Sequence, residues 1–329
     1  MIYVTGDTHG EFERFSAKRL RNSGIELTKE DYVIVCGDFG LCWAWDKTFD
    51  YHCKNFTLKP YTILWVQGNH ENYDMIAEFP LEEWHGGKVR HIVRDKVILL
   101  ERGQVFTIDG KTIFTFGGAS SHDIRGGVLD RNSVDFAEQR RRADRLELPY
   151  RIIHESWWPQ ELPTEGEMQE GLKNLEAHNF TVDYVITHCC STTLQNYLNK
   201  KKNRSNAPDV MTDYLEMLEQ KMQYKHWYFG HYHSDEVIDE KHTLMYHAIS
   251  ALEDGESVHF TPVLGCPRYD YGDTVRFAWG SDGEKVGVVR IIDAYGTFEQ
   301  NLEPSYDVYI ESEQCLYKHI CESEILGKV

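Results

Sequence analysis

Five short apolar runs, each followed at once by a glycine-rich or histidine-containing motif, constrain the fold of this chain more than any other feature. The runs are residues 2–5, 32–36, 62–66, 184–187 and 227–229. They are continuous rather than alternating, which is typical of strands covered on both faces of a sheet. Helical stretches lie between several of them, so residues 1–250 predict a layered α/β sandwich.

Local signals predict the elements between these runs. Helices are expected at 11–21, ended by Gly24, at 164–178 and at 211–223. The second begins with Thr164 and Glu167 at the spacing of a capping box. Residues 104–117 predict a hairpin that turns at Asp109-Gly110, so the sandwich should contain some antiparallel pairing.

The composition changes after Leu252, where acidic residues, glycine and proline interrupt the pattern. Short strand candidates follow at 274–279, 286–292, 306–310 and 315–317. Their number and length favour a small β-barrel. We therefore predict a catalytic domain at 1–252, a linker at 253–268 and a small β-rich, SH3-like accessory domain at 269–329, which could bind a protein partner.

Charge and cysteine content exclude several classes of protein. Lys and Arg total 35 against 53 Asp and Glu, a net charge of -18, which disfavours long nucleic acid as a partner. No apolar run has membrane-spanning length, so no membrane partner is expected. The eight cysteines show no CxxC spacing, and we expect no leader before the first strand. These features favour reduced thiols in a cytoplasmic enzyme.

The motifs that follow the apolar runs supply a metal-binding set of side chains. In order they are Gly6-Asp7-Thr8-His9-Gly10, Gly37-Asp38-Phe39-Gly40, Gly68-Asn69-His70-Glu71, His188 and Gly230-His231-Tyr232-His233. Loops at the carboxyl ends of parallel strands converge on one crevice. Carboxylate and amide oxygens mixed with imidazoles, without thiolate, suit Mn, Fe, Zn or a similar ion. Seven ligands are too many for one ion with an open position, but they suit two ions that share a carboxylate.

Each motif alone is weak evidence, because a lone Gly-Asp or His after a strand is most often a turn or a core residue. The ordered set GDTHG, GDFG, GNHE, a single His and GHYH resembles the calcineurin-like metallophosphoesterase superfamily over about residues 1–250. The motifs are most similar to those of Ser/Thr phosphatase and diadenosine-tetraphosphatase-like members. The resemblance implies a four-layer sandwich of two mixed β-sheets flanked by helices.

The resemblance also implies a role for each motif residue. One metal would be held by Asp7, His9, Asp38 and His233, and the other by Asp38, Asn69, His188 and His231. A hydroxide held between two divalent ions would attack phosphorus in line. The expected ion is Mn, with Fe, Zn, Ni or Co as the alternatives. His70 would act as general acid or transition-state stabiliser, and Glu71 would orient His70.

The second motif departs from the family pattern. An Asp, often followed by Arg, is usual where this chain has Leu41 and Cys42. The arginine that holds phosphate in Ser/Thr phosphatases therefore has no counterpart there, which puts protein-phosphatase activity in doubt.

Four further residues are candidates for substrate contact. Arg125 could clamp phosphate and His122 could contact the leaving group, although a plain glycine turn also explains their stretch. Trp43 and Trp45 could stack on a nucleobase, although packing of the loop is the more ordinary explanation.

The sequence thus predicts a metal-dependent hydrolase of a small or nucleotide-type phosphoester. The alternatives are a nuclease or cyclic-nucleotide phosphodiesterase, or a non-catalytic binding module stabilised by metal. An inert binding module fits less well, because all seven expected ligands and the His70-Glu71 pair are present.

Overall fold

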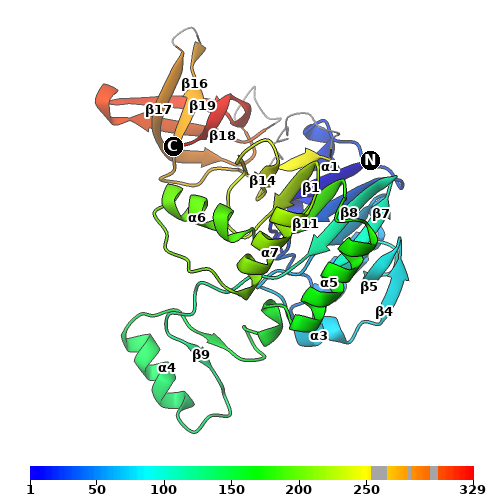
Figure 1. The fold of residues 1–329 in the computed structure, drawn as a ribbon. Helices are drawn as coiled ribbons and strands as arrows, with labels where there is room; N and C mark the ends of the chain where they lie inside the picture. The colour runs from blue at the N-terminus through cyan, green and yellow to red at the C-terminus, as the bar shows by residue number, and fades with distance from the viewer. Residues whose placement is uncertain (253–264, 281–282, 297–302) are drawn as a thin grey trace.

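Two β-sheets packed face to face form the body of the protein, and a third sheet is appended to it (Figure 1). The computed structural model describes residues 1–252, 265–280, 283–296 and 303–329. No helix within these ranges is long and apolar enough to cross a membrane.

The first sheet has seven strands in the order β15-β1-β2-β3-β6-β5-β4. They are β1 (Ile2–Thr5), β2 (Tyr32–Val35), β3 (Thr62–Trp65), β4 (Leu81–Trp84), β5 (Gly87–Val93), β6 (Val97–Leu100) and β15 (Ile249–Ala251). Strands β1, β2, β3 and β6 are parallel, and β15 and β5 pair antiparallel to their neighbours. Three of the five predicted runs are therefore adjacent strands.

The second sheet has six strands in the order β13-β14-β12-β11-β8-β7. They are β7 (Gln104–Ile108), β8 (Lys111–Phe116), β11 (Tyr184–Thr187), β12 (His226–Phe229), β13 (Glu236–Val237) and β14 (His242–Leu244). Strands β8, β11, β12 and β14 are parallel. The predicted hairpin joins β7 to β8, and both turn residues, Asp109 (φ 50°) and Gly110 (φ 73°), adopt the left-handed conformation that such a turn requires.

Helices cover the outer faces of both sheets, as Figure 1 shows for the second sheet. They are α1 (Ala17–Asn22), α2 (Lys47–Thr57), α3 (Tyr73–Ala77), α5 (Glu165–Ala177), α6 (Thr192–Lys201) and α7 (Val210–Lys221). Side chains of α2 and α3 pack in one core with Val33 and Trp65 of the first sheet. Those of α5, α6 and α7 pack in another with Phe114 and Trp227 of the second. A third core between the sheets completes the predicted four-layer sandwich.

Local capping explains where the helix predictions hold and where one fails. The Thr164 capping box has both of its hydrogen bonds, and α5 begins there as predicted. The single helix expected at 11–21 is wrong. Residues Phe12–Phe15 form a 3₁₀ turn, Ser16 is extended, and its side chain accepts a hydrogen bond from the amide of Arg19 to start α1 anew.

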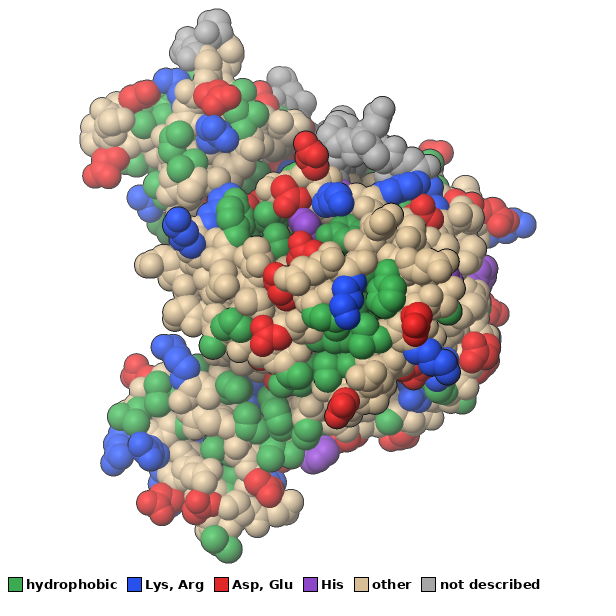
Figure 2. Space-filling view, in the orientation of Figure 1, with side chains coloured by type: hydrophobic (Ala, Val, Ile, Leu, Met, Phe, Trp, Pro, Cys, Tyr) green, Lys and Arg blue, Asp and Glu red, His purple; other side chains and the backbone are tan. Residues whose placement is uncertain are grey.

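Residues 122–158, here called the arm, project from the body between β8 and α5 (Figure 1). The arm contains β9 (Val128–Leu129), α4 (Phe136–Arg145) and β10 (Arg151–Ile152), and β9 and β10 pair in parallel. A 3₁₀ turn at Pro159–Glu161 leads from it back to the body. Figure 2 shows the arm as a lobe with a notch between it and the body.

The C-terminal residues form an antiparallel sheet with the order β19-β18-β17-β16-β20. Its strands are β16 (Thr274–Ala278), β17 (Glu284–Asp293), β18 (Ser305–Ile310), β19 (Cys315–Cys321) and β20 (Ile325–Lys328), with 3₁₀ turns at Glu311–Glu313 and Glu322–Glu324. The four predicted strands are present, and β20 was not predicted. Most of the predicted linker, 253–264, lies outside the described residues. The domain boundaries and the SH3-like character stay predictions.

Candidate metal centre

The sequence motifs follow the carboxyl ends of five parallel strands of the two sheets. Strands β1, β2 and β3 end at Thr5, Val35 and Trp65, and β11 and β12 end at Thr187 and Phe229. The residues that follow these ends are the candidate ligands Asp7, His9, Asp38, Asn69, His188, His231 and His233. The parallel arrangement therefore places them at one edge of the sandwich.

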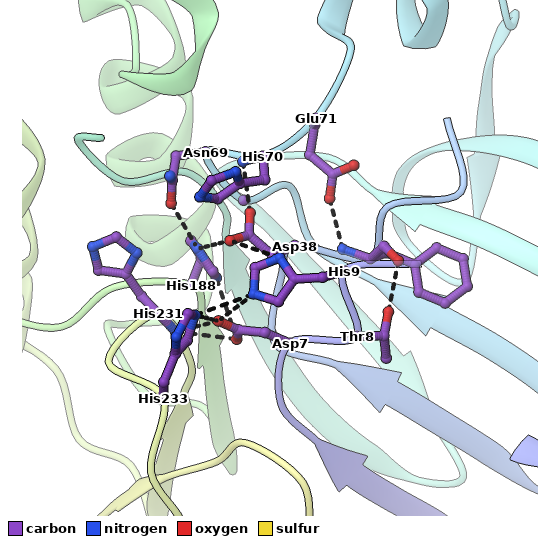
Figure 3. Close-up of polar contacts among 12 residues, drawn as sticks. Asp7, Thr8, His9, Asp38, Asn69, His70, Glu71, His188, His231 and His233 are labelled. Atoms are coloured by element: carbon purple, nitrogen blue, oxygen red, sulfur yellow. Dashed lines mark hydrogen bonds and ion pairs between the residues drawn. The ribbon is translucent and has the colours of Figure 1, made fainter. Parts of the chain in front are cut away.

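Two buried carboxylates lie at the middle of this cluster. Asp7 and Asp38 are each 1% exposed. Ligand atoms of Asp7, His9 and His233 lie within 4.8 Å of one another, and so do those of Asp7, Asp38 and His188. Figure 3 shows these imidazoles directed at the two carboxylates. Asp7 belongs to both groups, which makes the cluster continuous.

His188 is held with one ring nitrogen directed into the cluster. Its Nδ1 donates a hydrogen bond to the carbonyl oxygen of Cys36 at 2.7 Å, so Nε2 faces Asp38 at 3.4 Å. Histidines that bind metals through one ring nitrogen are commonly fixed by such a hydrogen bond from the other ring nitrogen. Burial alone would lower the pKa of His188, but the carboxylates of Asp38 and Asp7 raise it to about 9. The two carboxylates thus attract positive charge to this point.

The cluster fits a divalent cation. Oδ2 of Asp38 is buried without a hydrogen-bond donor among the described residues, and its contacts are Nε2 of His188 at 3.4 Å and Nδ1 of His9 at 3.9 Å. Nε2 of His9 and Nε2 of His233 lie 3.1 Å apart. A buried carboxylate oxygen without a donor is costly in an empty protein interior. Oxygen and imidazole donors converging on such a point are suitable ligands for Mn, Fe or Zn.

The backbone at the candidate ligands is strained. His9 (φ 46°), Asp38 (φ 47°), His231 (φ 69°) and His233 (φ 49°) are all in the left-handed region, where residues other than glycine are uncommon. Strain of this kind accumulates at functional sites.

Glycines of the motifs make room for the carboxylates. A Cβ at Gly68 would lie 2.0 Å from Oδ1 of Asp38, and a Cβ at Gly230 would lie 2.2 Å from Oδ1 of Asp7. Only glycine lets these backbones approach so closely.

Asn69 is oriented by a contact that the sequence did not indicate. Its Nδ2 donates to Oγ of Ser121 at 3.3 Å, so its Oδ1 faces Nε2 of His188 at 3.1 Å. Ser121 is held in turn by Glu161, which accepts from its hydroxyl at 2.7 Å and from its amide at 3.0 Å. Ser121 immediately precedes the candidate His122, but no pattern in the sequence indicated Glu161.

His70 lies at the edge of the cluster, beside the arm. Its amide donates to Oδ1 of Asp38 at 2.7 Å. Nη2 of Arg151 lies 2.8 Å from its Nδ1 and 2.9 Å from its Nε2. Burial lowers the pKa of His70 to about 4, and Arg151 acts in the same direction. Sequence reasoning missed Arg151, since nothing in the spacing of the motifs connects residue 151 with residue 70.

The role expected for Glu71 is corrected by its contacts. Its buried carboxylate accepts a hydrogen bond from the amide of Phe39 at 2.8 Å (Figure 3), and a further one comes from the backbone of Gly40. Glu71 thus supports the loop that carries Asp38, whereas the imidazole of His70 is contacted by Arg151 and by the ring of His9.

Two of the remaining candidates, His231 and His122, lie at the cluster. His231 is outside the two groups above; its amide donates to Asp7, and its Nε2 lies 3.0 Å from Nε2 of His122. His122 therefore stands beside a candidate ligand. Arg125 is exposed, and its expected role as a phosphate clamp stays a prediction.

Trp43 and Trp45 are partly exposed and pack on other aromatic side chains. Trp43 is 42% exposed and packs edge-to-face on buried Trp158. Trp45 is 56% exposed and lies over Phe79, with its indole nitrogen 3.4 Å from Oε1 of Glu78. Each ring therefore has packing partners and also an exposed part.

Comparisons with known proteins show the family of this chain. The family model described as calcineurin-like phosphoesterase matches residues 1–235, which include all seven candidate ligands. Among solved structures, the chain is similar to the phosphopantetheinyl hydrolase from Mycobacterium tuberculosis, with 14% sequence identity and a TM-score of 0.34. That match covers 74% of this chain and 87% of the hydrolase. No curated protein matches the sequence.

Proposed function

The chain belongs to the calcineurin-like phosphoesterase family, and from this premise we propose that it hydrolyses a small or nucleotide-type phosphoester with two divalent cations. The observation that carries the proposal is the buried pair Asp7 and Asp38, surrounded by imidazoles that all come from strand ends. The ligand side chains are polar and lie outside the three apolar cores.

Two overlapping ligand sets are available for the cations. One comprises Asp7, His9, Asp38 and His233, and the other comprises Asp38, Asn69, His188 and His231. When bound, such cations supply Lewis acidity toward the phosphoryl oxygens and the attacking water. Asp38 contributes to both sets, and its buried oxygen without a donor supports that assignment.

The protein's own residues hold this centre in shape before substrate arrives. The bond from His188 to the carbonyl of Cys36 fixes its ring, and the bond from Asn69 to Ser121 fixes its amide. A site held in this way needs little reorganisation during the reaction, which is where electrostatic catalysis gains most.

His70 is the side chain best placed to form a hydrogen bond with the leaving oxygen. It lies beside the cluster without belonging to either ligand group, and its amide is bonded to Asp38. We assign to its imidazole a hydrogen bond to the departing oxygen, a contribution worth roughly 10²–10⁴-fold in rate when proton transfer is involved.

Hydrolysis of p-nitrophenyl phosphate and of its bis ester by Mn²⁺-loaded protein tests the proposal. We expect turnover that a chelator removes and Mn²⁺ restores. Asp38→Asn should abolish turnover, and His70→Ala should lower kcat while the protein still binds Mn²⁺. Asp144→Asn, a change to an exposed carboxylate of the arm, is the control. Metal-loaded protein that is inert toward monoesters, diesters and nucleotides alike would refute the proposal.

A further inference from the structure

Arg151 is a buried cation of the arm that reaches the candidate centre. It is the first residue of β10, it is 5% exposed, and its Nη2 lies within 2.9 Å of both ring nitrogens of His70. The second motif places buried Leu41 and Cys42 where the family pattern usually has a charged pair. Arg151 is thus a positive charge brought to the site by a different part of the chain.

The guanidinium is fixed by acceptors behind it. Nε lies 2.7 Å from Oδ1 of Asp123 and Nη2 lies 2.8 Å from Oδ2 of the same carboxylate, a two-point ion pair. Nη1 donates to the carbonyl oxygen of Ser156 at 3.0 Å. A guanidinium has five N–H donors in a rigid plane. Asp123 and Ser156 therefore set its plane and leave one donor on Nη1 and one on Nη2, and Nη2 faces His70.

Resting on the function proposed above, we propose that Arg151 binds a terminal phosphoryl group and makes the site selective for phosphomonoesters over phosphodiesters. A terminal phosphoryl group has three non-bridging oxygens and up to two negative charges, whereas a diester has two such oxygens and one charge. A fixed arginine beside the centre stabilises the group with the extra oxygen and charge more strongly. Asp123 is a positioning residue, because it acts through Arg151.

This assignment gives the arm a function in substrate binding. Residues 122–158 place Asp123, Arg151 and Ser156 on one wall of the site, although Asp123 and Arg151 are separated by 27 intervening residues that include α4. The pairing of β9 with β10 brings the two ends of this insertion together. In this pairing Arg151 lies opposite Val128, five residues after Asp123.

The ratio of kcat/KM for p-nitrophenyl phosphate to that for bis-p-nitrophenyl phosphate tests the proposal. Wild type should prefer the monoester. Arg151→Ala should lower kcat/KM for the monoester about 100-fold and for the diester less than about 3-fold. Arg151→Lys should recover part of the loss, because lysine keeps the charge without the planar fork. Asp123→Asn should fall between wild type and Arg151→Ala. Arg140→Ala, on exposed α4, is the matched control and should keep the wild-type ratio.

Binding of inorganic phosphate gives a second readout that does not depend on turnover. Isothermal titration of Mn²⁺-loaded protein should show phosphate affinity reduced at least 10-fold in Arg151→Ala, with the Mn²⁺ content and the melting temperature within error of Arg140→Ala. Added guanidinium at millimolar concentration should restore part of the monoester rate of Arg151→Ala and none of that of Arg140→Ala.

Three results would overturn the proposal. They are equal losses on both substrates, unchanged phosphate affinity, and a wild-type preference for the diester. Each leaves the hydrolase function intact, because wild type would still turn over a phosphoester. Wild type inert on both substrates would instead refute the proposed function itself.

Discussion

Arg268, which precedes the C-terminal sheet, places its Nε 3.5 Å from Oδ2 of Asp235, two residues beyond His233. Asp235 also accepts hydrogen bonds from the amides of Tyr246 at 2.8 Å and His247 at 3.1 Å. The ring of Tyr246 stacks on the imidazole of His233, with centroids 4.8 Å apart. A chain of contacts thus connects the C-terminal sheet with the candidate metal centre.

Removing Arg268 should therefore weaken metal binding at a distance. Arg268→Ala leaves the buried carboxylate of Asp235 without its cation, and we expect about 10-fold weaker Mn²⁺ binding, as for other contacts that hold a ligand in place. Titration with Mn²⁺ measures this. Arg276→Ala, an exposed arginine of the same sheet, should bind Mn²⁺ as wild type does. Equal Mn²⁺ affinity in wild type, Arg268→Ala and Arg276→Ala would mean that the contact of Arg268 with Asp235 has no effect on metal binding.

Gly230 is a position where one added methyl group should disable the centre. The Cβ of Gly230→Ala would overlap Oδ1 of Asp7 at 2.2 Å and the carbonyl oxygen of Cys36 at 2.8 Å, so Asp7 must move. We expect turnover to fall at least 100-fold. Gly166→Ala is the control, because its Cβ would meet only Oγ1 of Thr164 at 3.8 Å, inside helix α5. Wild-type rates in Gly230→Ala would contradict the placement of Asp7.

Ser121 should matter although it is not a ligand. Ser121→Ala releases Nδ2 of Asn69 and leaves the buried carboxylate of Glu161 without the hydroxyl that it accepts from. We expect metal affinity to fall about 10-fold and the free energy of unfolding to fall by about 1–3 kcal/mol. Metal titration and urea unfolding measure the two effects. Ser205→Ala, a change to an exposed serine, should change neither, and a stability loss without a change in metal affinity would limit Ser121 to a structural role.

The strands and their motifs could be predicted from the sequence because their signals are local. A continuous apolar run followed by Gly-Asp or Gly-Asn-His indicates a buried strand end whatever the rest of the chain does. The parallel sheets then bring these ends together, so Asp7, Asp38 and His188 meet as the sequence predicts.

The contacts that support this centre could not be predicted in the same way. Arg151 of the arm contacts His70, Ser121 contacts Asn69, and Glu161, in the turn after the arm, holds Ser121. No spacing rule in a single sequence predicts that residues so far along the chain contact this site. Glu71 failed as a prediction for a related reason, because the direction of its side chain depends on where the loop after β2 lies.

Glu322 should make the stability of the protein depend on pH. It is buried in the C-terminal sheet, where its Oε2 accepts hydrogen bonds from the amide of Arg268 at 2.8 Å and from the hydroxyl of Tyr306. Burial raises the pKa of Glu322 to about 7, although Arg268 opposes the shift. The folded protein therefore holds a proton on this carboxyl at pH values where the unfolded chain has released it.

The sign follows from this difference in bound protons. Below about pH 4.5 both states are protonated, and the group has no effect. Between about 4.5 and 7 the folded state binds more protons, so the free energy of unfolding falls as the pH rises, by at most about 3 kcal/mol in total. Glu322→Gln removes this contribution. Urea unfolding at pH 5 and pH 8 should show the variant gaining stability relative to wild type at the higher pH. Glu311→Gln, an exposed control in the same sheet region, should follow wild type at both values. A constant difference between wild type and Glu322→Gln across this range would mean that the carboxyl does not titrate there.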